Sequence, residues 1–194
     1  MAKTQQKSSQ YSLKPAEIKK LIFSCTNFRN RCLIKLMAYT GMRRAEVRDL
    51  DIQDVDFERR RIHIRNGKGG KSRVVVVSQS VLADLTHLIG NQQNGPVFVS
   101  NKGSRFNNAQ INRIVAQAGK AAKIVNPNPR LKHINPHLLR HSYGRNARAA
   151  GQRIEFIQHQ LGHASIKTTM DIYGKPSVDD MQEDYEQKME GIYG

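Results

Sequence analysis

The chain has 194 residues, which is long enough for one domain with a substantial hydrophobic core. Its 32 Lys and Arg residues outnumber its 16 Asp and Glu residues, and the net charge of +16 favours DNA or RNA as a partner over a membrane. No apolar run approaches the roughly 20 residues of a membrane span. Cys25 and Cys32 follow no secretion signal and are expected to be reduced core residues of a cytoplasmic protein.

The N-terminal part of the chain is expected to be helical. Residues 1–11 are polar and are expected to form a mobile arm. A first helix should begin near Pro15, because proline fits the first helical turn and apolar residues follow at helical spacing. A second helix is expected over residues 29–40, ended by Gly41, and a short third helix over about 44–50.

The apolar pattern then changes from helical spacing to alternation. Residues 54–57, 61–65 and 73–77 predict the three strands of a small antiparallel sheet. A glycine-rich turn at 66–71 joins the last two strands and forms a basic hairpin tip. Because the third strand contains four successive valines, we expect it to be the most buried of the three.

Helical spacing returns in the second half of the chain. Apolar residues at this spacing predict three helices, over residues 81–89, 107–123 and 154–161. A further helix should begin at an Asn-Pro pair, 135–136, and end near Gly151. The predicted fold is therefore mainly α with a small three-stranded antiparallel sheet (α+β), in one domain over residues 12–174.

The last twenty residues differ in charge from the rest of the chain. Residues 175–194 contain six acids and two bases, a net charge of −4 that leaves +20 on the remainder. Apolar residues recur there at helical spacing, namely Met181, Tyr185, Met189 and Ile192. Such an acidic amphipathic helix is expected to dock against protein rather than DNA.

Two basic residues are predicted to stand at turns from which they could reach a phosphate. Arg43 precedes the third predicted helix, and Glu46, three residues on, could hold its guanidinium in place. Lys68 lies among glycines at the hairpin tip, where it could enter a DNA groove or deliver a proton. Taken alone, Arg43 is more simply a helix-end residue and Lys68 a solvated turn lysine. Lys71 and Arg73 compete for any role at the tip.

The C-terminal half adds two imidazoles, a guanidinium and a phenol. His137 and Arg140 lie three residues apart and could grip a phosphate from one helix face. His163 follows a predicted helix end, and Tyr173 lies on a short segment. Each could instead serve only in packing, and His141 is expected to be structural. The spacing of Cys and His residues supports no zinc site, so no metal is expected.

Five short motifs occur in order along the chain: Thr-Gly-Met-Arg-x-x-Glu, Gly-Lys-Gly, His-x-Leu-Arg-His, Leu-Gly-His and Thr-Thr-x-x-x-Tyr. Each is weak alone, but the ordered set resembles the tyrosine recombinase (phage integrase) family from about residue 12 to residue 173. The resemblance implies the catalytic-domain fold of that family. It also implies six catalytic residues and one supporting acid, which are Arg43, Lys68, His137, Arg140, His163, Tyr173 and Glu46.

The same resemblance implies a DNA strand transferase that cleaves and rejoins double-stranded DNA in integration, excision or inversion. The two arginines and His163 would neutralise phosphoryl charge, and Tyr173 would form a 3′-phosphotyrosine. His137 would serve as the base and Lys68 as the acid. Because the covalent intermediate conserves the phosphoester energy, neither a metal nor another cofactor is expected. The tail helix would link four protomers on DNA, although its apolar stripe could instead fold back on its own core.

One departure from the family concerns the N-terminal side. The family usually carries a DNA-clamping domain, and only about a dozen residues precede the first predicted helix here. We therefore expect either a catalytic-domain fragment or a short recombinase similar to the fimbrial inversion enzymes. Two other functions fit the same residues. One is a type IB topoisomerase-like nicking and closing enzyme, and the other is a non-catalytic DNA-binding regulator with the same fold.

Overall fold

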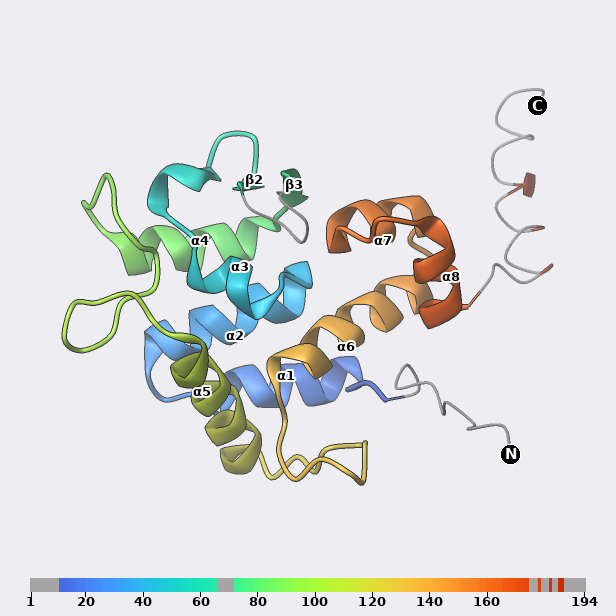
Figure 1. Ribbon diagram of the computed structural model, residues 1–194, viewed down its shortest axis with the longest axis horizontal. Helices are drawn as coiled ribbons and strands as arrows, with labels where there is room; N and C mark the ends of the chain where they lie inside the picture. Colours follow the sequence, from blue (N-terminus) through green and yellow to red (C-terminus); the bar gives the residue numbers. More distant parts are fainter. Residues whose placement is uncertain (1–10, 66–71, 175–177, 179–181, 183–184, 187–194) are drawn as a thin grey trace.

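The computed structural model describes residues 11–65, 72–174, 178, 182 and 185–186. Its helices are α1 (Pro15–Phe23), α2 (Phe28–Thr40), α3 (Arg44–Arg48), α4 (Gln79–Ile89), α5 (Asn108–Ala121), α6 (Pro136–Ala149), α7 (Ile154–Leu161) and α8 (Ile166–Tyr173). Its strands are β1 (Val55–Asp56), β2 (Arg61–Ile64) and β3 (Arg73–Val76), in the antiparallel order β1-β2-β3 (Figure 1). The predicted mainly α architecture with one small sheet is confirmed.

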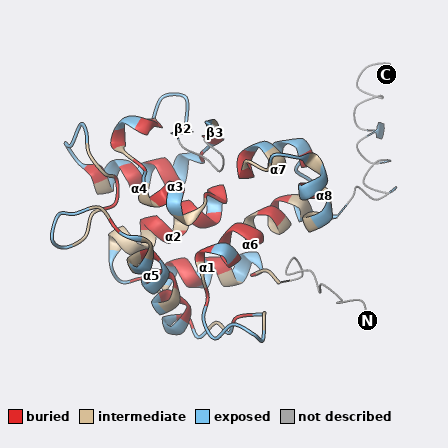
Figure 2. Cartoon of the chain, in the orientation of Figure 1, coloured by how far each residue is buried: buried red, intermediate tan, exposed pale blue. Residues whose placement is uncertain are grey.

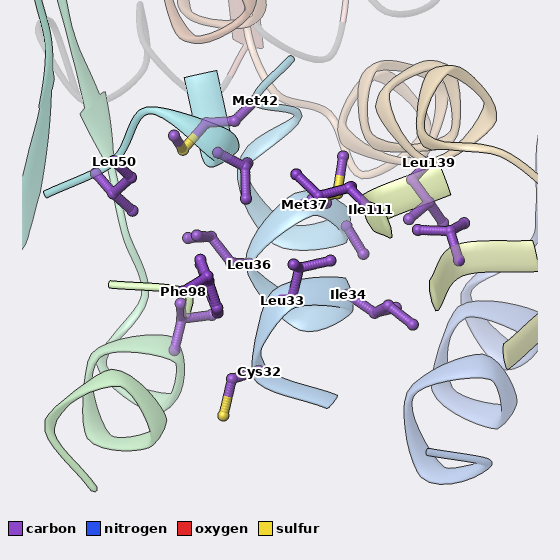
Figure 3. Close-up of a cluster of buried hydrophobic side chains, with 14 of the residues drawn as sticks. Cys32, Leu33, Ile34, Leu36, Met37, Met42, Leu50, Phe98, Ile111 and Leu139 are labelled. Atoms are coloured by element: carbon purple, nitrogen blue, oxygen red, sulfur yellow. The ribbon is translucent and has the colours of Figure 1, made fainter. Parts of the chain in front are cut away.

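Helix α2 lies at the centre of the main core. It contacts α1, α3, α4 and α6, and its buried residues cover most of its circumference, whereas Tyr39 is exposed and Lys35 partly exposed (Figure 3). A helix with so wide a buried face is stable only when other elements pack around it. Both cysteines are buried and free, as the sequence predicts, and Cys32 lies on α2 itself. The end of α2 is thereby held at a defined place in the middle of the molecule.

The two longer strands of the sheet each have one buried face. In β2, Ile62 and Ile64 are buried, and in the third predicted strand Val75 and Val77 are buried while Val76 is 63% exposed. Over the predicted span 73–77 only Val76 is exposed, against three residues of the span 61–65, so the valine-rich strand is the more buried of these two. β3 is an edge strand, which has a partner strand on one side only. On its other side, the side chain of Gln160 bonds to both the N–H and the C=O of Val76, at 2.9 and 2.8 Å.

Helices α6, α7 and α8 form a second, smaller packing unit next to the main core (Figure 1). Its apolar centre consists of Ala147, Ile157 and Leu161, with Tyr143 and Tyr173 packed against it. α6 belongs to both units, because its inner face also contributes Leu138 and Leu139 to the main core. Figure 2 shows this buried inner face of α6 opposite its exposed side. In the part of the chain that the structure describes, no helix could span a membrane.

The central position of α2 leads to a prediction about stability. Leu33 is fully buried on this helix, so replacing it with Ala should lower the free energy of unfolding by about 2–5 kcal/mol through lost burial and a residual cavity. Phe23, at the end of α1, is 77% exposed, and Phe23→Ala should change stability by no more than about 0.5 kcal/mol. Urea unfolding followed by circular dichroism compares the two variants. Equal losses would contradict the arrangement of the core.

Candidate active site

The site is built around the ends of two helices, each of which is closed by a glycine. Gly41 follows α2 with φ +65°, and Gly162 follows α7 with φ +64°, in the left-handed region that favours glycine. A Cβ on Gly41 would come within 2.6 Å of Leu161, and one on Gly162 within 2.8 Å of Arg73. The two glycines therefore let the helix ends approach the side chains of the site closely.

Arg140 is buried between these two helix ends. From α6 it donates to the carbonyl of Gly41 at 2.7 Å and to the carbonyl of Leu161 at 2.5 Å, and only 6% of the residue is exposed. Carbonyls at a helix C-terminus carry partial negative charge, so they offset part of the cost of burying a cation. Burial, reinforced by Arg43, lowers the pKa of Arg140 to about 10, so the guanidinium remains charged at neutral pH.

Glu46 is a buried carboxylate that two arginines share. Arg43 donates to it at 2.9 Å and Arg73 donates through both terminal nitrogens, at 2.6 and 2.8 Å. Arg43 also donates to the carbonyl of Gly162 at 3.0 Å. Burial by itself raises the pKa of Glu46, but the bonds from Arg73 and Arg43 outweigh it and the net pKa is lowered. The predicted contact of Glu46 with Arg43 is therefore present, and it is part of a larger network.

Arg73 belongs to the site, whereas its place in the sequence predicts only a competitor of Lys68 at the hairpin tip. In the structure its side chain is 8% exposed and turns inward from the first residue of β3 to Glu46 and to the carbonyl of Gln160, at 3.2 Å. A charged residue that opens an otherwise apolar strand was the available signal. Arg73 thus ties the sheet to α3 and α7.

The two imidazoles of α6 form a pair. Nε2 of His137 lies 2.7 Å from Nε2 of His141, and the two rings are nearly perpendicular. His137 is exposed, whereas only 9% of His141 is exposed. Burial, with smaller contributions from His137 and Arg140, lowers the pKa of His141 to about 4. The pKa of His137 is lowered as well, by desolvation and then by Arg140. Both rings are therefore neutral at neutral pH.

Tyr173 ends α8 and lies against α6. Tyr173 can lie this close to α6 only because residue 144 is glycine, since a Cβ there would come within 2.5 Å of the phenol oxygen. The ring centroid is 6.3 Å from that of His163 and 6.4 Å from that of His141. Burial raises the pKa of Tyr173, although the charges of Arg140 and Arg145 act in the opposite direction. The phenol is thus protonated at neutral pH in the free protein.

His163 follows the end of α7 and is parallel to the ring of Tyr173. Its Nδ1 lies 3.0 Å from Oγ1 of Thr169, a fully buried residue of α8. Burial, with Arg140 and Arg43 nearby, lowers the pKa of His163 to about 4, so this ring too is neutral at neutral pH. The contact with Thr169 fixes the orientation of the His163 imidazole beside the phenol of Tyr173.

An open hollow of about 500 Å³ lies beside these groups and receives side chains from α3, α5 and α6. It is lined by Arg43, Arg44, Ala45, Asn112, Asn135, Pro136, His137 and Arg140. The structure therefore brings Arg43, Glu46, His137, Arg140, His163 and Tyr173 together around one region. Lys68 lies outside the described residues. Among the described residues, no cluster of His, Cys, Asp or Glu side chains has the arrangement of a metal site.

The shared carboxylate predicts a pH-dependent stability. Glu46→Gln leaves the buried Arg73 and the partly buried Arg43 without their counter-charge and should cost about 3 kcal/mol at pH 7. Because the pKa of Glu46 is lower in the folded than in the unfolded chain, its stabilisation is complete above the unfolded value near 4.3. It is lost as the pH falls through the folded value.

Urea unfolding between pH 7 and pH 3 measures the difference in stability between wild type and Glu46→Gln, which should shrink below about pH 4. Glu155→Gln is the matched control, because Glu155 is about half exposed and pairs weakly with Arg153 at 3.6 Å. It should cost about 0.5 kcal/mol or less. If the difference in unfolding free energy between wild type and Glu46→Gln stays constant with pH, Glu46 is not the ionised counter-charge of the two arginines.

The chain is similar to known recombinases along almost its whole length. Tyrosine recombinase XerA of Pyrococcus horikoshii is 33% identical over 179 residues, which are 91% of this chain and 61% of that protein. A crystal structure of XerA recombinase matches with a TM-score of 0.73 at 34% identity, over 91% of this chain and 64% of that one. The XerH recombinase in its pre-cleavage complex with difH matches with a TM-score of 0.73 at 27% identity, over 92% and 54%.

These comparisons agree with the order of motifs and with the fold. The chain spans about three fifths of the length of the XerA protein that it matches. The sequence model of the phage integrase family matches residues 11–179, which include every element described above. Because that match covers most of the sequence, this chain belongs to the phage integrase family.

Proposed function

We propose that this chain is the catalytic part of a site-specific DNA recombinase, which cleaves and rejoins DNA strands through a 3′-phosphotyrosine. The observation that carries the proposal is that Arg43 and Arg140 line one open hollow and that Tyr173 lies close enough to Arg140 for this charge to act on its phenol. Double-stranded DNA is the proposed partner. A net charge of +16 and the solved complex of XerH with its difH substrate both support this choice.

In the proposed reaction the arginines stabilise charge on the phosphoryl group. Cleavage of a phosphodiester builds negative charge on its non-bridging oxygens, and guanidiniums fixed in advance stabilise that charge without reorganising. Arg140 is held by two backbone carbonyls and Arg43 by Glu46 and Gly162. Both side chains also line the hollow, where the phosphate would bind. His163 is proposed as a further donor to the same group.

Tyr173 is the proposed nucleophile. Its oxygen attacks phosphorus, the bond to the 5′ oxygen breaks, and a 3′-phosphotyrosine and a free 5′-hydroxyl result. The nearby charge of Arg140 favours the phenolate, against the effect of burial. Lys68 is proposed as the acid that protonates the leaving oxygen. For His137, the assignment as base stays a prediction, and its tautomer decides whether it accepts or donates a hydrogen bond.

Two other functions share parts of this site. A type IB topoisomerase-like enzyme would form the same phosphotyrosine but rejoin only the original strand, whereas a recombinase joins a strand from a second duplex. A DNA-binding regulator would form no covalent bond. The buried network around Glu46 argues against the regulator, because DNA binding alone does not require arginines fixed by a shared carboxylate. Transfer of a labelled strand between two duplexes distinguishes the recombinase from the topoisomerase.

The nucleophile is tested by Tyr173→Phe, which removes one oxygen and keeps the ring on α6. Duplexes that the protein selects from a random pool are nicked so that the leaving strand diffuses away and the adduct is trapped. We expect no covalent adduct from Tyr173→Phe and unchanged DNA binding in a mobility-shift assay. Tyr185→Phe is the control and should form the adduct at the wild-type level. An adduct formed by Tyr173→Phe would place the nucleophile elsewhere.

Residues 175–194 are proposed to link neighbouring protomers into a tetramer on DNA. Most of this segment lies outside the described residues. Among those described, Val178 is 79% and Tyr185 61% exposed, which favours docking on another molecule over packing on the same core. A pocket of about 250 Å³ between α1, α2 and α6, lined mainly by apolar groups and bordered by Lys19, offers a complementary site for an acidic amphipathic helix.

Truncation after Ser177 tests the role of the tail. Because the proposed active site lies upstream, the shortened protein should bind a single DNA site with wild-type affinity. It should lose cooperative assembly on paired sites and at least tenfold of its strand exchange, measured by mobility shift and by product formation. Unchanged strand exchange by the truncated protein would show that the tail does not join the protomers.

A further inference from the structure

The pair of histidines on α6 holds one proton between its two facing nitrogens. Nε2 of His137 and Nε2 of His141 are 2.7 Å apart, which is a hydrogen-bond distance. Two N–H groups would repel at this separation, and so would two lone pairs. One neutral imidazole must therefore donate and the other must accept, and the direction of this bond sets the tautomers of both rings.

The surroundings of His141 determine that direction. His141 is 9% exposed, and its Nδ1 is buried without a hydrogen-bond partner among the residues that the structure describes. Buried N–H donors without a partner are rarer in proteins than buried acceptors without one. The less costly arrangement therefore leaves a lone pair on Nδ1 of His141 and places its proton on Nε2. The charges of Arg140 and Arg145 disfavour a second proton on this ring, so only one of its two nitrogens carries hydrogen.

We propose that His141 is a positioning residue, which donates its Nε2–H to Nε2 of His137 and so fixes the proton of His137 on Nδ1. The lone pair on Nε2 of His137 then accepts the hydrogen bond from His141. The N–H of His137 is on Nδ1, which takes no part in that bond. The side chain of His137 lines the hollow next to Arg43 and Arg140. His141 was expected to be merely structural, and it is given a role in the site by this geometry.

The consequence for the reaction rests on the function proposed above. A neutral His137 with its proton on Nδ1 is a hydrogen-bond donor, like the two arginines beside it. It therefore suits a non-bridging phosphoryl oxygen, and its Nδ1 is not available to accept the proton of Tyr173. The role of His137 as a base, expected from the family resemblance, would require the opposite tautomer.

The tautomer can be measured without DNA. In wild-type protein labelled with ¹⁵N at histidine, long-range ¹H–¹⁵N spectra at pH 8 distinguish protonated from unprotonated ring nitrogens. His137→Gln identifies the signals of His137 by their loss. We expect the proton of His137 on Nδ1 and the proton of His141 on Nε2. A wild-type spectrum with the proton of His137 on Nε2 would overturn the proposal. This measurement holds even if the chain proves to have no recombinase activity.

Variants of His141 measure the effect on cleavage of the nicked duplexes described above. Gln places its amide near the position of Nε2 and can still donate to His137, whereas Asn places it near Nδ1 and Leu has no donor. At saturating DNA we expect adduct formation to slow by about tenfold to a hundredfold in His141→Leu and His141→Asn, the range known for groups that orient metal-binding imidazoles. His141→Gln should restore most of the rate.

His159→Leu, on the exposed side of α7, is the control and should cleave at the wild-type rate. Thermal unfolding shows whether each variant is folded at the assay temperature. Equal rates for the Leu and Gln variants, with both folded, would mean that His141 does not act through its Nε2–H. A wild-type protein that forms no adduct would instead contradict the recombinase proposal. The measured tautomer of His137 would then decide whether His141 positions its proton.

Discussion

The structure depends on the placement of a buried guanidinium at the C-terminal ends of two helices. Arg140 would be very costly to bury alone, and the carbonyls of Gly41 and Leu161 make its burial possible. These carbonyls are free because α2 and α7 end there, at glycines in the left-handed conformation. The same contacts hold α2, α6 and α7 in fixed relation, so the position of Arg140 and the packing of these helices depend on each other.

Glu46 supplies the counter-charge that this cluster of arginines needs. It accepts from Arg43 and Arg73, which come from the start of α3 and the start of β3. Arg73 continues to the carbonyl of Gln160, and the side chain of Gln160 satisfies the open edge of β3. The network thereby joins the sheet to α7. Its rigidity matters for the proposed chemistry, because charge stabilisation is effective only when the donors are in place before the reaction.

Around this rigid centre the imidazoles and the phenol are kept neutral. Burial and the neighbouring arginines lower the pKa of His141 and of His163 to about 4, and burial raises the pKa of Tyr173. A free site in this state holds a protonated phenol between neutral imidazoles and fixed cations. A phosphate arriving in the hollow would meet donors without any change of protonation. Proton transfer is then needed only at the nucleophile and at the leaving oxygen, as the proposed mechanism requires.

Much of this protein could be predicted from local sequence features. Glycines at helix ends, an Asn-Pro helix start and the change from helical to alternating spacing predicted the elements from α1 to α7 to within a few residues, whereas α8 was predicted only as a short segment. The ordered motifs predicted the family, because their residue types and their order along the chain can be read without the tertiary structure. The residues that could hold a phosphate were identifiable for the same reason.

Other features depended on contacts between residues far apart in the chain. The valines of the third strand predicted burial, but which of them are buried was decided by the face that packs on the core: Val75 and Val77 are buried and Val76 is exposed. Arg73 and Gln160 gain their roles only where β3 meets α7, and the charge of Arg73 at the start of an apolar strand does not indicate which partner it binds. The spacing of His137 and His141 places them on one helix face, but the direction of the bond between them depends on the burial of one ring. Helical spacing determined which side chains are neighbours, whereas their protonation was decided by the packing around them.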